Sequence, residues 1–482
     1  MNKILIIFCL LCFSLSVSAQ QFSQYNTNTL FDSFENPSQR SFIPDSSRQY
    51  AFNFLIPNFD INTYLTGNIQ PGIKSRLFSD NAFYNTSKLK IGQGKYNHFN
   101  ANVNAYSIMF KTFTSLNGDV EMGFSAQTKA ESRGYFSDES LAIFNGVQKF
   151  PLGNYNDIFN NHYSYQAYHQ LGFSYRERIN NKIAIGFKLS ALLGIQYQKI
   201  DIDHSSIDFD RSTFNNPKAL LSLQGRYYDS YIPGQMTAHD YLPTFRNPGA
   251  AITLGGSYKT DDHITIQANV KDLGFIHWSK RSNIYNFNNS DSLRDLSSIH
   301  REDTIYNRVH KILKNNGITQ SFTTPINGRA ELSATKSYWL DDNNQFKYSP
   351  TLIASKELFF AGFTGALVNH FQYRNITATL TTSYDDMKFF NVGTQFMVKS
   401  PNVEFFIGTD RLVNTGRLAL SAVLKSENQI SQVNNYTGGD FYLGFALKFG
   451  HVIEHPMNAS YIPMGEKGFF GRLFGRLFKT DK

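Results

Sequence analysis

The sequence predicts an all-β protein, an antiparallel β-barrel that spans a membrane with about 14 strands. Segments with alternating apolar and polar residues recur through most of the 482-residue chain. Such alternation places apolar side chains on one face of a strand and polar side chains on the other. Aromatic residues make up 15% and charged residues only 17%, as suits a barrel with aromatic girdles. Beyond the N-terminal segment, no run of about 18 apolar residues occurs, which excludes membrane-spanning helices.

Residues 1–19 have the pattern of a secretory signal peptide. Basic Lys3 precedes an apolar stretch, and residues 17–19 (Val-Ser-Ala) form a small-residue cleavage site. Both cysteines of the chain, Cys9 and Cys12, lie within this segment. The expected mature chain therefore has no thiol for a disulfide, a nucleophile or a metal site.

Residues 20–47 are polar, with irregularly spaced aromatic residues and an Asn36-Pro37 dipeptide, and they show no clear strand pattern. We expect this stretch to plug the barrel or line its lumen. A tail on the surface is the alternative.

The predicted barrel occupies residues 48–450. The alternation is clearest between His263 and Trp278, where aliphatic residues alternate with Thr, Gln, Asn and Lys. Lys, Glu or Gln stands at mid-strand on several polar faces, which a lumen tolerates and the dry interior of a sandwich does not. We therefore expect the apolar faces to point outward. Other alternating segments begin at Tyr50, Phe99, Val120, Tyr165, Ile183, Ile252, Ala330, Thr351, Gly365, Ile376, Asn391, Val403 and Phe441.

Short and long connections alternate along the chain, as in bacterial outer-membrane barrels. Both termini of an even-stranded barrel lie on one side, so we expect periplasmic short turns and extracellular long loops. Sixteen strands are possible if Ala219–Tyr227 and Leu418–Leu424 also pair. The expected long connections are Pro57–His98, Phe136–His162, Ile200–Gly249, Ser279–Asn327 and Arg411–Asp440.

One loop contains a predicted helix. In Asp303–Gly317, apolar residues recur with the spacing of one helix face. We expect this helix to cap or fold over the mouth of the barrel.

Residues 451–482 are predicted to form a periplasmic tail with a basic amphipathic segment. A tandem Gly-Arg-Leu-Phe repeat gives a helix an apolar face flanked by arginines, suited to a partner's groove or a membrane surface. The glycines would cost about 1 kcal/mol each in a helix, so a frayed basic tail is the alternative. The residues of this segment are Phe470, Arg472, Leu473, Phe474, Arg476, Leu477 and Phe478.

No catalytic motif is present, and we predict a non-enzymatic protein with no cofactor and no metal. His162 and His169 lack a Ser or carboxylate at a spacing typical of a membrane phospholipase. Asp201, Asp203, Asp208 and Asp210 offer oxygen ligands for calcium, although a solvated loop explains them as well. Asn100, Asn102 and Asn104 are expected to form a polar ladder in the lumen.

Three short motifs resemble those of a known family. Asp272-Leu273-Gly274-Phe275-Ile276-x-Trp278 follows one strand, Phe322-Thr323-Thr324-Pro325 precedes another, and Thr409-Asp410-Arg411-Leu412 lies late in the chain. Their order resembles an uncharacterised Bacteroidota family of predicted outer-membrane barrels with a domain of unknown function. Asn36-Pro37 is similar to the Asn-Pro motif of that family and of type IX secretion and gliding accessory barrels, with Ser38 replacing their usual Ala. More distantly, the chain is similar to FadL-like fatty-acid channels.

The resemblance implies an outer-membrane location and a barrel, and it implies no substrate. We predict a structural or accessory subunit of an outer-membrane complex of the secretion, assembly or motility type. A FadL-like or porin-like passive channel for a small or hydrophobic solute is the alternative. Expected partners are outer-membrane lipid and other envelope proteins, reached through the tail and long loops. The net charge of +8 does not predict nucleic acid, because the basic residues are dispersed.

Overall fold

The computed structural model describes residues 21–42, 48–79, 84–113, 120–212, 217–231, 236–298, 300–360, 362–385, 389–424, 426, 429–430 and 437–450. The expected signal peptide and the C-terminal tail, with its Phe470–Phe478 segment, lie outside these ranges. Within them, no helix has the length and hydropathy needed to cross a membrane.

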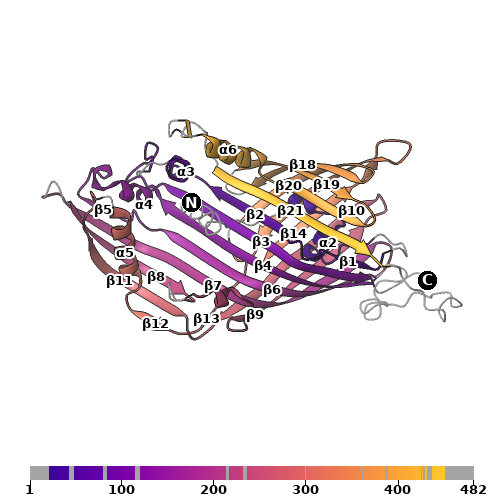
Figure 1. Ribbon diagram of the computed structural model, residues 1–482, viewed down its shortest axis with the longest axis horizontal. Coiled ribbons are helices and arrows are strands. Elements are labelled where there is room, and N and C mark those ends of the chain that lie inside the picture. The colour runs from indigo at the N-terminus through magenta and orange to yellow at the C-terminus, as the bar shows by residue number, and fades with distance from the viewer. Residues whose placement is uncertain are drawn as a thin grey trace.

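The described residues form a closed antiparallel barrel of 14 wall strands, which confirms the predicted fold class (Figure 1). The first wall strand is broken into β1 and β2, and both parts pair with β3 on one side and β21 on the other, which closes the ring. The wall strands are β1 (Tyr50–Phe52) with β2 (Asn58–Leu65), β3 (Tyr96–Phe113), β4 (Val120–Ser137), β6 (His162–Arg178), β7 (Ile183–Asp210), β9 (Pro248–Lys259), β10 (Ile264–Trp278), β14 (Arg329–Lys336), β16 (Phe346–Glu357), β17 (Phe363–Tyr373), β18 (Ile376–Asp385), β19 (Phe390–Lys399), β20 (Val403–Thr409) and β21 (Thr437–Phe449).

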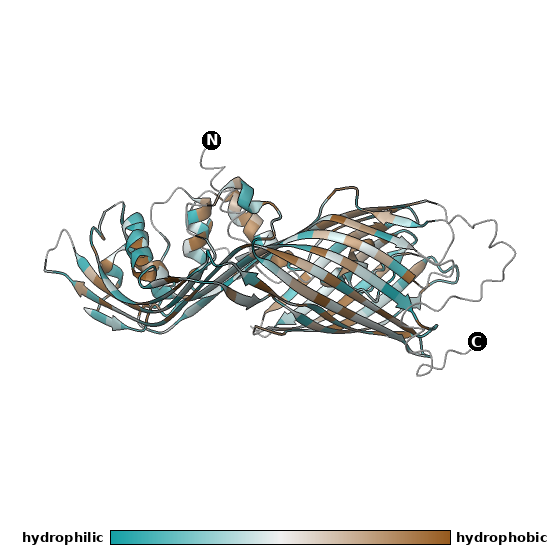
Figure 2. Ribbon diagram, turned by 90° about the horizontal axis from the view of Figure 1, so that it is seen from below, coloured by the Kyte–Doolittle hydropathy of each residue, from teal (hydrophilic) through white to brown (hydrophobic). Residues whose placement is uncertain are grey.

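The two faces of the wall differ as the alternation predicts. In β14, Leu332 is 55% exposed on the outer face, whereas its neighbour Ser333 is 4% exposed on the inner face. Lys188 and Gln267 are likewise buried on the inner face. Hydrophobic and hydrophilic residues alternate along the wall strands in Figure 2. Because only lipid stabilises such an apolar exterior, the wall has the surface of a membrane barrel.

The two ends of the barrel differ, and we name them by their connections. The turn end carries short turns such as Ile179–Lys182 and Arg374–Asn375, together with the start of β1 and the end of β21. The loop end carries the helices α3 (Gln70–Phe78), α4 (Asp138–Ala142), α5 (Arg301–Leu313) and α6 (Leu412–Val423), the 3-10 turns η2 (Ile143–Asn145), η3 (Val147–Lys149) and η4 (Ala238–Tyr241), and the short strands β5 (Asn154–Asn156), β8 (Lys218–Asp229), β11 (Asn283–Leu293), β12 (Gly317–Thr319) and β13 (Phe322–Pro325). A further short strand, β15 (Tyr338–Trp339), pairs with β16.

A sheet extends beyond the barrel at the loop end (Figures 1 and 2). β7 is 28 residues long, and its second half leaves the barrel to pair with β8, which in turn pairs with β11. One face of this extension is covered by α5, η2 and η3, and it has its own hydrophobic core that includes Phe150, Leu223, Phe287 and Ile312. We call this unit the outer sheet.

Several expectations about the connections were wrong. Ala219–Tyr227 belongs to β8 of the outer sheet, and Leu418–Leu424 falls largely in α6, so neither adds a wall strand. The expected helix is present as α5, but it packs on β8 and β11, because Ile305 and Ile312 enter the core of the outer sheet. The expected loop Pro57–His98 contains β2, which positive φ angles at Phe54 and Leu55 separate from β1.

Candidate functional site in the barrel lumen

Residues 21–42, here called the inner segment, lie inside the barrel, where Figure 1 shows α2 behind the wall strands. The segment contains η1 (Phe22–Gln24) and α2 (Leu30–Glu35). Thr29 caps α2 by accepting a hydrogen bond from Asp32 N at 3.2 Å, and the Asp32 carboxylate accepts one from Thr27 N at 3.0 Å. These local bonds stabilise a helix of six residues that would be too short to persist alone in water.

Apolar side chains of the inner segment form a core within the lumen. Leu30 and Phe34 are fully buried, and Phe31 packs edge-on against Tyr106 and Phe406 of the wall, with ring centroids 5.7 Å apart in both pairs. Burial of one such side chain contributes about 1.5–3 kcal/mol. Part of the lumen is thus filled by apolar side chains of the inner segment and of the wall. The polar inward faces of the strands do not by themselves predict such a hydrophobic core.

Wall carboxylates bind backbone amides of the inner segment near both ends of the barrel. At the loop end, Phe22 N donates to Asp410 Oδ2 at 2.8 Å. At the turn end, Leu30 N donates to Glu404 Oε2 at 2.8 Å, and Ser41 N donates to Glu121 Oε2 at 2.9 Å. Charged acceptors make stronger hydrogen bonds than neutral ones. The inner segment is therefore attached to the wall along its length.

The Asn36-Pro37 dipeptide packs against two glycines that face each other across β7 and β9. Gly186 and Gly255 are cross-strand partners on the inner face of the wall. A Cβ atom on either glycine would lie 2.9 Å from Ser38 N and still closer to Pro37 or Asn36. Only glycine leaves room for a backbone to approach this closely.

A network of ion pairs crosses the middle of the lumen. Lys271 Nζ lies 3.2 Å from Glu35 Oε2 of the inner segment and 3.1 Å from Glu331 Oε2 of β14. Lys129 Nζ lies 2.5 Å from Asp272 Oδ2. Two cavities beside these residues have volumes of about 30 Å³ each, which is room for about one water molecule.

Asp272 enters this network because of a β-bulge. The register of β10 against β9 shifts between Val270 and Leu273, and Asp272 has a φ of 48°. Lys271 and Asp272 consequently both point inward, although they are neighbours in the chain. Gln170 Nε2 also donates to Asp272 Oδ1, at 2.9 Å.

The remaining residues of the Asp272–Trp278 motif divide between the two faces. Leu273 and Phe275 are 42% and 51% exposed on the outer face. Ile276 and Trp278 are fully buried inside, and Trp278 Nε1 donates to Thr324 Oγ1 at 2.8 Å. The motif therefore begins at the bulge, after which the side chains of β10 alternate between the two faces in the opposite phase. The second motif, Phe322–Pro325, contains Thr324, the hydrogen-bond partner of Trp278.

Comparison with known proteins identifies the family. A model described as a family of unknown function, DUF5723, matches residues 41–410. The chain belongs to this family. No curated protein matches it.

Solved structures similar to the chain include two toluene transporters and a FadL homologue. The Pseudomonas putida toluene transporter TodX is 8% identical, with a TM-score of 0.40, over 90% of this chain and 95% of that one. A Pseudomonas aeruginosa FadL homologue is 10% identical, with a TM-score of 0.39, over 90% and 99%. The Ralstonia pickettii toluene transporter TbuX is 10% identical, with a TM-score of 0.28, over 86% and 93%. The likeness concerns the barrel fold alone.

Other residues singled out in the sequence lie away from the lumen network. His162 Nδ1 lies 2.8 Å from Asp201 Oδ1, and His169 Nδ1 is bonded to Thr128 Oγ1 at 2.9 Å. Asp201–Asp210 is part of strand β7, so the loop expected at these four aspartates is wrong. Within the described ranges, no group of three or more metal-binding side chains gathers.

The asparagine ladder faces the lumen as expected, with Asn102 buried opposite Asn62 of β2. Sequence reasoning placed Glu331 on the polar face of its strand and missed the charged lumen residues Glu35, Lys129 and Glu404. Their positions on the polar face of alternating strands were the available signal for the wall residues. For Glu35, which lies on a short helix, no periodicity gave such a signal.

Proposed function

We propose that the protein is an outer-membrane barrel that is closed in its resting state and serves as a non-enzymatic accessory subunit of an envelope complex. The turn end faces the periplasm and the loop end faces the outside. The observation that carries this proposal is the inner segment, which is bound across the lumen by the wall of its own barrel.

The energies involved favour the closed state. Burying Leu30, Phe31 and Phe34 contributes at most roughly 4–9 kcal/mol in total. Since each 1.4 kcal/mol changes an equilibrium constant about tenfold, this burial term alone corresponds to three to six orders of magnitude, and the chain entropy lost on ordering the segment opposes it. A solute that opened the barrel would have to contribute a comparable binding energy.

The outer sheet supports the accessory role. A strand needs only about 9–11 residues to cross a bilayer, so the second half of β7 lies outside the membrane. The covered face of the outer sheet has its own core and holds its shape without the barrel interior. A rigid element of this kind presents strands and loops to a partner protein.

Single-channel recording in planar bilayers tests the closed state. We expect the protein containing residues 20–482 to show no steady conductance and a deletion of residues 21–42 to conduct. Steady conductance of the undeleted protein would contradict the proposal. Gentle detergent extraction followed by mass spectrometry tests the accessory role, which requires a stoichiometric partner that is lost when the outer sheet is deleted.

A passive channel for a small solute is the second candidate. The lumen around the inner segment is lined by ionised and amide side chains such as Lys129, Glu331 and Gln170. Such a lining favours a polar solute over a hydrocarbon. Solute uptake by proteoliposomes distinguishes the candidates, because a channel accelerates uptake with the inner segment present and an accessory subunit does not.

A further inference from the structure

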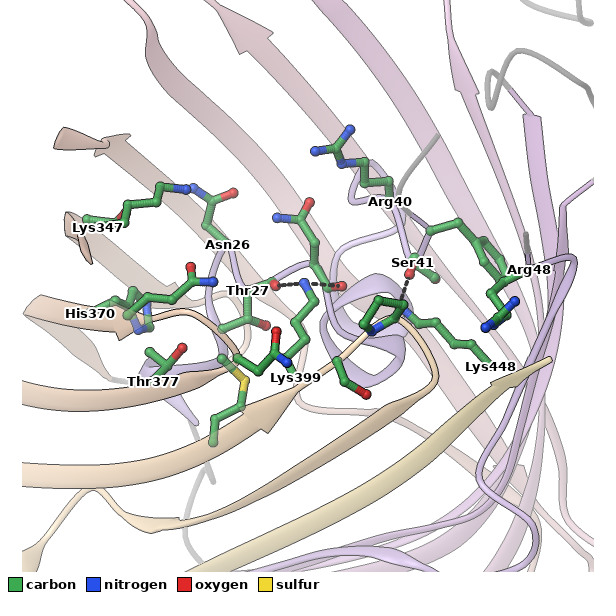
Figure 3. Close-up of a pocket in the computed structure, with 18 residues that line it drawn as sticks. Asn26, Thr27, Arg40, Ser41, Arg48, Lys347, His370, Thr377, Lys399 and Lys448 are labelled. Atoms are coloured by element: carbon green, nitrogen blue, oxygen red, sulfur yellow. Dashed lines mark hydrogen bonds between the residues drawn. The ribbon is translucent and has the colours of Figure 1, made fainter. Parts of the chain in front are cut away.

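A cationic cavity lies at the turn end, between the inner segment and the wall (Figure 3). Its volume is about 320 Å³, far larger than the cavities at mid-lumen. In Figure 3, side chains from the inner segment and from β16, β19 and β21 surround it. The cavity lies outside the ion-pair network that crosses the lumen.

Five basic side chains line this cavity. Two are arginines near the end of the inner segment and before β1, and three are lysines of the wall: Arg40, Arg48, Lys347, Lys399 and Lys448. Among the 18 lining residues, all within the described ranges, none is acidic. Lys448 forms an ion pair with Glu404, which lies just outside the lining, at 2.6 Å. With Lys448 paired and Arg48 left out of the count, Arg40, Lys347 and Lys399 still give the lining a surplus of positive charge.

Two of the lysines also hold the floor of the cavity in place. Lys399 Nζ donates to Thr27 O at 2.6 Å and to Asn28 O at 2.9 Å, and Lys448 Nζ donates to Ser41 O. Backbone carbonyls carry only partial charge, so these bonds orient the ammonium groups without neutralising them. The floor is thus formed before any ligand arrives, which reduces the entropy lost on binding.

We propose that this cavity binds an anion that carries two phosphoryl groups. Arginine guanidinium groups bind phosphate oxygens in bidentate geometry, and lysines add point charges. Two phosphoryl groups bring a charge comparable to the surplus of the lining, whereas a single carboxylate leaves most of it unbalanced. The cavity also has polar groups suited to such oxygens, including the side chains of Ser349, Gln372 and Thr377.

The proposal does not rest on the closed state of the barrel. It requires only the cavity and its charges, so it can fail while the barrel remains non-conducting, and it can hold for a barrel that conducts. Lys399 and Lys448 line the cavity and also donate hydrogen bonds to the inner segment. An anion that attracts these ammonium groups would therefore change the hydrogen bonds that hold residues 27–41.

Calorimetric titration of the detergent-solubilised protein with inorganic pyrophosphate tests the proposal. We expect saturable binding of one equivalent, which weakens as salt rises. The double variant Arg40→Gln with Lys347→Gln should lower the affinity by about tenfold or more. Neither side chain takes part in the bonds that Lys399 and Lys448 make to the floor. Lys182→Gln, at an exposed turn on the same end, is the matched control and should bind as the unmodified protein does.

The source of the phosphoryl groups is resolved by competition. Displacement of pyrophosphate by cardiolipin in mixed micelles identifies a lipid headgroup, and the absence of displacement identifies a soluble anion. No saturable binding, or equal affinity in the Arg40→Gln/Lys347→Gln variant, would overturn the proposal.

Discussion

The close approach of the inner segment to Gly186 and Gly255 leads to a sharp prediction. A methyl group on either glycine would sit 2.9 Å from Ser38 N and closer still to the Asn36-Pro37 dipeptide. Overpacking of this kind costs about 1–3 kcal/mol. If the segment shifts instead, it loses the bond from Arg176 Nε to Ser38 O, of 2.9 Å, for a similar cost.

Each substitution to alanine should therefore raise the released fraction of the inner segment by a factor of roughly 5–150. Against the roughly 4–9 kcal/mol from the buried apolar side chains, one substitution leaves the segment bound. The double variant Gly186→Ala with Gly255→Ala should release it measurably. In the chain without residues 1–19, the rate at which a protease cleaves the inner segment measures the released fraction. Conductance in a planar bilayer measures how often the lumen is open.

Gly256→Ala is the matched control, because a Cβ there meets no atom within 4 Å. A second control is the same double variant in a chain that lacks residues 21–42, where no clash exists and stability should be unchanged. The reasoning is refuted if the double variant is as protease-resistant as Gly256→Ala. It is equally refuted if the two alanines destabilise the deleted chain as much as the full one.

Three further predictions concern single side chains. Phe34→Ala should cost about 3–5 kcal/mol and lower the denaturant concentration at which the inner segment becomes protease-sensitive. Asp272→Ala leaves Lys129 without its partner in the lumen and should lower the unfolding free energy of the barrel by about 3–5 kcal/mol, measured by urea titration. Hydrogen bonds from the Thr237 backbone and side chain hold the pKa of Asp240 well below its usual range. The loop at η4 should therefore keep its stability above about pH 4 and lose it as the pH falls further. Amide hydrogen exchange of this loop at low pH measures the loss.

Each of these has a control. Phe124→Ala removes a ring that is 59% exposed on the outer face, and should leave the inner segment bound. Adding Lys129→Met to Asp272→Ala should recover part of the lost stability, and no recovery would argue against an uncompensated lysine as the cause. Asp240→Asn should make the loop equally labile at neutral and acid pH, and a persisting pH dependence would assign it to another group.

The barrel was predictable because each wall strand repeats the same alternation. A strand such as β14 shows in eight residues which side faces lipid and which side faces the lumen. The outer sheet was not predictable, because its strands continue out of the membrane with similar alternation. No change of pattern in the sequence therefore indicates where β7 leaves the bilayer. The helical state of α6 was missed because a short apolar run suits a strand or a helix equally well.

The lumen was predictable in part. Alternation places Lys271 and Glu331 inside, but it also places Asp272 outside, and the bulge that turns Asp272 inward is a tertiary feature. The pairing of Glu35 with Lys271 joins residues far apart in the chain, and no local pattern records it. The irregular N-terminal stretch with its aromatic residues has no pattern from which the wall residues that contact it could be predicted.

The length of β7 has a mechanical consequence. At about 3.3 Å per residue, its 28 residues extend for about 90 Å, from the turn end of the barrel, near which Gly186 lies beside the inner segment, to the tip of the outer sheet. A force that pulls on that tip acts along the strand, so it shears the backbone hydrogen bonds that join β7 to β6 and β9. In this geometry many hydrogen bonds bear the force at the same time. Tension applied to the outer sheet would thus be transmitted along β7 to Gly186, against which Pro37 packs.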